Sequence, residues 1–283
     1  MSFRPLNGTL LGMKSSLHLI FSFLFLLTLI AFVITRDGFA ETGPLGFGFA
    51  ELHEPMSTDR PDFTESTKTV QAGHVQGEFG YRYTRDGRQD VRQQAAPEGL
   101  LRLGMTDTVE LRFSAQGLNE RGKDFALGDT TVGTKIKLFE ACDCNFEIST
   151  IIDITLPTGA ERYSQDKTSS QVSLLWSYDQ ESDWSLGGQV NFNAAVENEE
   201  YFFQPASSLS VSYALTERLG VYTEYFGFFP QGNNAPSNSP EHYMNGGFTY
   251  LLEENLQLDI LAGTGMNQRA DDAFFGGGIS FRL

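Results

Sequence analysis

Cysteine and histidine are scarce in this chain of 283 residues, which contains two cysteines and four histidines. Cys142 and Cys144 are separated by one residue, so a disulfide between them would close a strained ring. A lone C-x-C pair also supplies too few ligands for a structural zinc site. We therefore predict no metal centre and interpret both cysteines as turn residues, with a local disulfide left open.

Basic residues are few as well, with 20 Lys and Arg against 36 Asp and Glu and a formal net charge of −16 at pH 7. Without a basic stripe to neutralise phosphates, nucleic acid is excluded as a partner. The glycine runs at 263–265 and 276–278 precede no helical pattern and lack the lysine of a phosphate loop. Glycine within a strand more often marks a close backbone approach or a tight bend. No cofactor is predicted.

Long uncharged apolar runs occur only near the start of the chain, from Leu17 to Thr35. Lys14 precedes this run, and residues 38–40 (GFA) place small side chains where signal peptidase cleaves. We predict a signal peptide over residues 1–40, with translation starting at Met1 or Met13. An uncleaved anchor is the alternative, because the run is long enough to span a bilayer.

Helical amphipathicity is lacking after residue 73, where short segments alternate with a period of two. In GHVQGEFGYRYT, Val75 and Phe79 share one parity, whereas Glu78 and Arg82 share the other. We count twelve such strands, four of which carry two charges on one parity and almost wholly apolar residues on the other. Five connections are short, and six longer polar ones lie at about 85–96, 118–125, 157–169, 194–204, 229–241 and 266–272.

This layout predicts an all-β fold, an up-and-down antiparallel transmembrane β-barrel of about twelve strands over residues 73–283. Lipid offers the backbone no hydrogen-bond partner, so a sheet that spans the membrane must close on itself. Residues 41–72 would form a short N-terminal segment, either periplasmic or inserted in the lumen. The predicted location is the outer membrane of a Gram-negative-type bacterium.

A soluble β-sandwich also alternates in polarity and is the competing fold. Three features favour the barrel: the signal peptide, aromatic residues near strand ends such as Trp176 and Trp184, and the final strand. In that strand Phe275, Ile279 and Leu283 are in phase on the apolar face. The phasing resembles the C-terminal signal that the barrel-assembly machinery binds, so this machinery and outer-membrane lipid are the expected partners.

Charged residues on the polar parity are predicted to face the lumen. Mixed signs permit a hydrated, weakly selective passage, and they equally permit an interior closed by ion pairs. The residues predicted to line the pore are Glu78, Arg82, Arg102, Glu110, Arg112, Lys135, Lys137, Glu147, Asp153, Glu224, Asp259 and Arg282.

The stretch STDRPDFTES at 57–66 concentrates three carboxylates and an arginine just before the first strand. A metal clip is one hypothesis, but the spacing matches no EF-hand, and an acid/base pair is another. We favour an N-terminal latch at the periplasmic mouth, in which Asp59, Arg60, Asp62 and Glu65 pair with charges inside the near end of the barrel. Pro61 would fix the local turn.

STDRPDFTES also resembles the N-terminal signature of a family of bacterial outer-membrane transporters, often labelled with the MetA-pathway (meta-cleavage) of phenol degradation. The turn repeats LGMTDTVELR (103–112), ALTERLGVY (214–222) and LLEENLQLD (251–259) are similar to that family, as are ITLPTGA (154–160) and GGGISFRL (276–283). The resemblance covers roughly residues 57–283. It implies an outer-membrane β-barrel, and its substrate label is not carried over.

We predict a porin-like channel that passes small solutes, including hydrophobic or aromatic ones, rather than an enzyme. A non-conducting structural or surface-interaction barrel is the first alternative. The second is a lipid-active enzyme, because outer-membrane phospholipases are also twelve-stranded and use serine and histidine. Only His53, His74 and His242 remain after the signal peptide, and no motif places a serine beside any of them.

Overall fold

The computed structural model describes residue 52 and residues 55–86, 91–121, 124–141, 145–161, 163–180 and 183–283. The predicted signal peptide at 1–40, most of the following stretch as far as residue 54, and both cysteines lie outside the described residues. No helix in the described ranges is both long and apolar enough to cross a bilayer.

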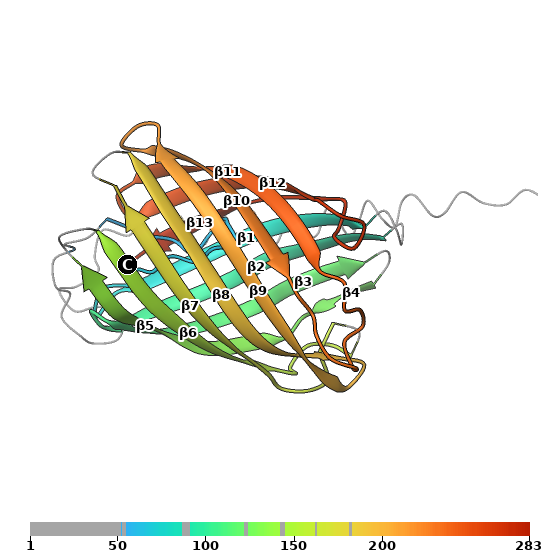
Figure 1. Cartoon of the computed structure of the whole chain (residues 1–283). Coiled ribbons are helices and arrows are strands. Elements are labelled where there is room, and N and C mark those ends of the chain that lie inside the picture. Colours follow the sequence, from blue (N-terminus) through green and yellow to red (C-terminus); the bar gives the residue numbers. More distant parts are fainter. Residues whose placement is uncertain are drawn as a thin grey trace, which may run out of the picture.

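Thirteen strands form one antiparallel sheet. They are β1 (Val75–Asp86), β2 (Val91–Thr106), β3 (Val109–Arg121), β4 (Asp124–Leu127), β5 (Thr130–Ala141), β6 (Phe146–Leu156), β7 (Ser169–Asp179), β8 (Trp184–Glu197), β9 (Glu200–Ala214), β10 (Leu219–Phe228), β11 (Glu241–Glu253), β12 (Leu256–Gly265) and β13 (Ala273–Arg282). The strands are tilted against the long axis of the barrel (Figure 1).

The sheet closes on itself because β1 pairs with both β2 and β13. β3 pairs with β2 and β5, while the short β4 pairs only with the end of β3, at Leu118–Arg121. Twelve strands therefore form an up-and-down barrel, and β4 is an extra strand at its rim. The predicted fold class is confirmed.

Period-two alternation separates the lipid face from the lumen. On β6, Ile151 is fully buried, whereas Ile152 is 43% exposed. Large apolar residues of the outward parity remain exposed around the barrel, including Leu174, Leu209, Phe248, Ile260 and Phe275. An apolar belt of this kind is what the hydrocarbon core of a membrane covers.

Three of the six predicted long loops are shorter than expected. β1 and β2 extend to Asp86 and Val91, and β8 and β9 extend to Glu197 and Glu200. Asn198 and Glu199 have positive φ angles of 50° and 61°, which closes the β8–β9 connection as a tight turn. The expected loop at 118–125 is taken up largely by β3 and β4. The strands extend beyond the apolar belt, and their ends carry polar residues that still pair with the neighbouring strand. Because these residues are polar, the sequence pattern assigned them to loops, and the predicted strand ends were wrong.

Replacing Ile152 by arginine should lower the free energy of unfolding by about 2–4 kcal/mol, because a charge would enter the lipid face near the middle of β6. Guanidinium titration in lipid vesicles measures this. Ser149, which from parity alone would tolerate arginine, is unsuitable as a control. It is fully buried, and its Oγ donates to the carbonyl oxygen of Thr67. The matched control is Ser212→Arg on the lumen side, and an equal loss there would contradict the assigned lipid face.

Candidate functional site

The lumen contains residues 55–74, here called the N-terminal segment, which contact the inner wall along their length. Near the tight-turn end, Thr69 Oγ1 donates to the carbonyl oxygen of Asp107, in the β2–β3 turn. Further inside, Thr64 Oγ1 lies 2.6 Å from Ser208 Oγ of β9. Met56, Asp59, Thr64, Thr67 and Val70 are all buried.

Wall carboxylates hold the backbone of this segment. Glu78 accepts hydrogen bonds from the amides of Asp59 and Arg60, at 3.0 and 2.9 Å. Glu224 accepts from the amides of Phe63 and Thr64, at 2.8 and 2.5 Å. On β3, Glu110 accepts from the amide of Val70 at 2.8 Å. Because a buried amide without a partner is costly, these three carboxylates replace the ladder bonds that an irregular segment lacks.

Asp59 lies in a cluster of basic side chains from three neighbouring strands. Its carboxylate oxygens lie 2.5 Å from Arg112 Nη1, 2.8 Å from Lys135 Nζ and 3.5 Å from Arg102 Nη1. Burial opposes ionisation, but Arg102, Lys135 and Arg112 together hold the pKa of Asp59 well below its ordinary range. Asp59 is therefore ionised while the N-terminal segment occupies the lumen.

Arg60 crosses the lumen to a different part of the wall. Its Nε and Nη2 lie 3.2 and 3.1 Å from the two carboxylate oxygens of Asp259 on β12, a bidentate arrangement. The guanidinium lies against Gly80 of β1 and Gly278 of β13, where an added Cβ would come within 2.2 and 2.5 Å of it. The two inward glycines therefore leave the space that the arginine occupies.

Glu65 also contacts Arg112, through Oε1 and Nη2. Four carboxylates (Asp59, Glu65, Glu78 and Glu110) share three cations (Arg102, Arg112 and Lys135) in this network. One carboxylate is therefore in excess. Burial raises the pKa of Glu65 to about 7 against the attraction of Arg112, and the nearby charge of Asp59 also raises it.

The seated segment should consequently be more stable in mild acid. With a pKa raised from 4.5 to about 7, the contribution of Glu65 to the free energy of unfolding is complete below pH 4.5 and is lost as pH rises through 7. The difference between wild type and Glu65→Gln should therefore change by roughly 3 kcal/mol at most between pH 5 and pH 9. Guanidinium titrations at several pH values measure it. Glu217→Gln, in an exposed turn, is the control; an equal pH dependence in wild type and Glu65→Gln would contradict the assignment.

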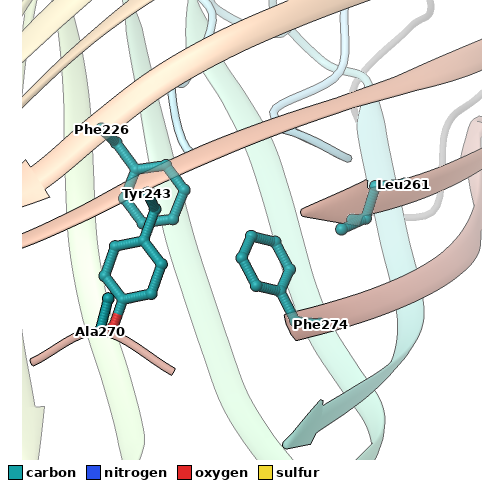
Figure 2. Packing of buried hydrophobic residues seen from close by; sticks show 5 residues of the cluster. All are labelled: Phe226, Tyr243, Leu261, Ala270 and Phe274. Atoms are coloured by element: carbon teal, nitrogen blue, oxygen red, sulfur yellow. The ribbon is translucent and has the colours of Figure 1, made fainter. Parts of the chain in front are cut away.

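The segment reaches deeper than the periplasmic mouth at which the sequence placed it. Phe63 stacks on Phe226 with ring centroids 4.6 Å apart and meets Phe228 edge to face at 5.4 Å. Phe226 in turn packs in a buried cluster with Tyr243, Leu261, Ala270 and Phe274 (Figure 2). Ala270 belongs to the long β12–β13 connection, so Phe63 lies in the half of the lumen toward the long loops.

Of the remaining residues predicted to face the lumen, some contact the N-terminal segment and others pair within the wall. Glu147 pairs with Lys68 of the segment, a cation that no sequence pattern indicated. Arg282 Nη1 donates to the carbonyl oxygen of Pro55 at 3.4 Å. Arg82 pairs with Glu98 and Lys137 with Glu140, both within the wall. Asp153 is half-buried on β6 and pairs with no cation in the described ranges.

The aromatic lining of β10–β13 is a feature that sequence reasoning missed. Phe226, Tyr243 and Phe274 lie on the inward parity, which was expected to be polar. A signal was present, since Phe226 shares its parity with Glu224, and Tyr243 shares its parity with Asn245. The alternation of side chains along these strands therefore indicates that the three aromatic residues face the lumen, although their apolar character suggested the lipid face.

Cavities lie along the inner wall of the barrel. The larger one, of about 710 Å³, lies between the segment and the inner wall of β7–β12, and is here called the vestibule. Its lining includes Ser177, Ser185, Ser212, Thr249 and Gln257 from the wall. A smaller one of about 250 Å³ lies beside Arg82 and Glu98. The described part of the chain contains no group of three residues able to hold a metal ion, so a metal clip at 57–66 has no support.

A family model described as "Putative MetA-pathway of phenol degradation" matches residues 58–283. The chain belongs to this family. The match begins within STDRPDFTES and includes every strand of the barrel. No curated protein matches the chain.

Solved structures share the fold of this family member at low identity. An outer-membrane channel from Pseudomonas putida F1 has a TM-score of 0.59 at 12% identity, covering 77% of this chain and 98% of that one. The NanC porin has a TM-score of 0.55 at 11% identity, covering 74% and 100%. The translocator domain of autotransporter NalP from Neisseria meningitidis has a TM-score of 0.50 at 7% identity, covering 74% and 87%. The chain is thus an outer-membrane β-barrel in a lipid environment.

Proposed function

We propose that this barrel is a passive channel for small solutes and that the N-terminal segment narrows its lumen. The observation that carries the proposal is the division of the lumen. Ion pairs hold the segment to β2, β3 and β5 and, through Arg60 and Asp259, to β12, while the vestibule remains beside these contacts, between the segment and the wall of β7–β12. A barrel whose only role was structural would have no need of a polar cavity of about 710 Å³.

The wall of the vestibule supports a weakly selective passage for polar solutes. Its serine and threonine hydroxyls can replace the water around a neutral solute without holding it tightly. Two of the comparison structures are an outer-membrane channel and a porin, which is consistent with this role. The predicted preference for hydrophobic or aromatic solutes would depend on the aromatic cluster around Phe226 in the outer half.

The pore-lining and latch residues keep their proposed roles in this scheme. Arg82 and Glu98 would line the outer part of the passage, and Asp59, Arg60 and Glu65 would fix the segment. Asp62 forms no ion pair with a described residue, so its part in the latch is its hydrogen bond from Ser210. The C-terminal strand, β13, would be the element recognised by the barrel-assembly machinery.

Reconstitution in planar bilayers tests the channel. Discrete conductance steps are expected, together with uptake into proteoliposomes of small polar solutes and of hydrophobic or aromatic ones. Heat-dependent mobility on a gel establishes that the protein is folded. Folded protein without permeability to ions or solutes would favour a non-conducting barrel, for which the ion pairs of the segment are the supporting observation. Fatty-acid release from phospholipid would instead favour the enzyme.

A further inference from the structure

Tyr222 is the first sign of a ligand site within the vestibule. The residue is only 7% exposed, it lines the cavity, and its hydroxyl has no hydrogen-bond partner among the described residues. Buried phenol hydroxyls are normally paired, because leaving one unpaired costs the free energy of its lost hydration. A buried hydroxyl group without a partner, on a residue that lines a polar cavity, therefore points to a partner that the cavity would supply.

Asp62, in the N-terminal segment, is the second sign and lines the same cavity. The carboxylate accepts a hydrogen bond from Ser210 Oγ at 3.2 Å, and no cation of the described chain pairs with it. Burial, followed by the nearby charge of Glu224, raises the pKa of Asp62 well above its ordinary value. Glu224 accepts hydrogen bonds from the amides of Phe63 and Thr64, from the Thr64 hydroxyl and from Asn245, and all of these donors are neutral. Among the described residues, neither the Asp62 carboxyl nor the Glu224 carboxyl therefore pairs with a cation.

The cations of the N-terminal segment do not pair with Asp62, because each is bound to another carboxylate. Arg60 is engaged by Asp259 in a bidentate pair, and Lys68 is engaged by Glu147. Both cations also line the vestibule, but the carboxylates that pair with them belong to β12 and β6. The region around Asp62 therefore keeps an excess of acid groups inside a cavity that is large enough for a small organic molecule.

We propose that the vestibule binds a small hydroxylated primary amine, with its ammonium group between the Asp62 carboxylate and the Tyr222 hydroxyl. This inference rests on the proposed channel function, since it names a class of solute for the same lumen. An ammonium group has three donors and no acceptor, so it matches the oxygens of Asp62, Tyr222 and Ser210 as acceptors. The hydroxyls of Ser212 and Thr249 would bind the hydroxyl group of the solute. A metal ion fits less well, because the described residues offer no third ligand of the usual kinds.

Isothermal titration of the full, folded protein in detergent tests the site, with 2-hydroxyethylammonium chloride as the probe. Binding is expected for this probe and not for ethylene glycol, which lacks the charge, or for tetramethylammonium, which lacks N–H donors. Asp62→Asn should weaken binding by about tenfold or more and Tyr222→Phe by several-fold. Asp107→Asn, which removes an exposed negative charge from the β2–β3 turn, should bind as wild type does.

Proton release provides an independent reading. An ammonium ion bound to Asp62 would displace its proton to the buffer, so the measured heat should vary with the ionisation enthalpy of the buffer, and Asp62→Asn should abolish that variation. Equal affinity for the probe and ethylene glycol, or undiminished binding by a folded Asp62→Asn protein, would overturn the site. If Asp62→Asn does not fold, Tyr222→Phe decides. Binding without conductance would overturn only the channel, and conductance without binding only this inference.

Discussion

Deleting residues 57–66 should raise the single-channel conductance several-fold and leave the barrel folded. The deleted residues include Asp59 and Arg60, which connect the segment to opposite parts of the wall, and Phe63, which packs on Phe226 in the outer half. None of them belongs to a strand, so the closed sheet is preserved. Planar-bilayer recording gives the conductance, and heat-dependent gel mobility reports folding.

Two controls separate an opened lumen from a general disturbance. Replacing 57–66 by a Gly/Ser linker of equal length keeps the chain length but removes the contacts, and it should conduct as the deletion does. Deleting 232–238, in the β10–β11 loop, should leave the conductance close to that of wild type. An unchanged channel and an unchanged melting profile after deletion of 57–66 would remove the latch hypothesis.

Asp59→Ala should lower the free energy of unfolding by about 3–5 kcal/mol, since it removes one partner from a buried ionic network. Lys135 would lose its nearest carboxylate, at 2.8 Å, and keep only Glu110 at 3.9 Å. The amide of Ser66, which donates to Asp59 Oδ1, would also lose its acceptor. Guanidinium titration in lipid vesicles provides the measurement.

The same variant should move the titration of Glu65 toward acid, because Arg112 would no longer be shared with Asp59. Asp107→Ala, in an exposed turn, is the matched control and should be close to neutral. A loss below about 1 kcal/mol for Asp59→Ala would mean that the segment contributes little to the folded barrel.

The sequence was sufficient to predict the barrel because a sheet in lipid must close on itself and expose apolar side chains on its outer face. Along β1 the apolar residues Val75, Phe79 and Tyr81 alternate with the polar residues Gln76, Glu78 and Arg82. In a closed sheet with lipid outside, the apolar set must face outward and the polar set inward. The parity of Glu78, Arg102, Glu110 and Lys135 followed directly, and the structure places all four inside and fully buried. Whether they line a passage for solutes stays a prediction.

The sequence could not predict which lumen residues contact each other. Arg60 lies 199 positions before Asp259, and Phe63 lies far from Phe226 in sequence, so no local pattern connects them. The depth of the segment was underestimated for the same reason, since its amides are held by Glu78 and Glu224 on distant strands. The rim was misjudged at β1–β2 and β8–β9, where strands continue into water and polarity no longer distinguishes strand from loop.

The side chains that hold the segment would also act on a solute once the segment is withdrawn. β2, β3 and β5 would then present Arg102, Arg112 and Lys135 to the water-filled interior, with Glu110 as the acid among them. β10 and β12 would present Glu224 and Asp259. An electric field would therefore run across the channel, perpendicular to the direction of transport, and would orient dipolar solutes as they pass. A zwitterion should accordingly cross the protein lacking 57–66 faster than an apolar solute of equal size.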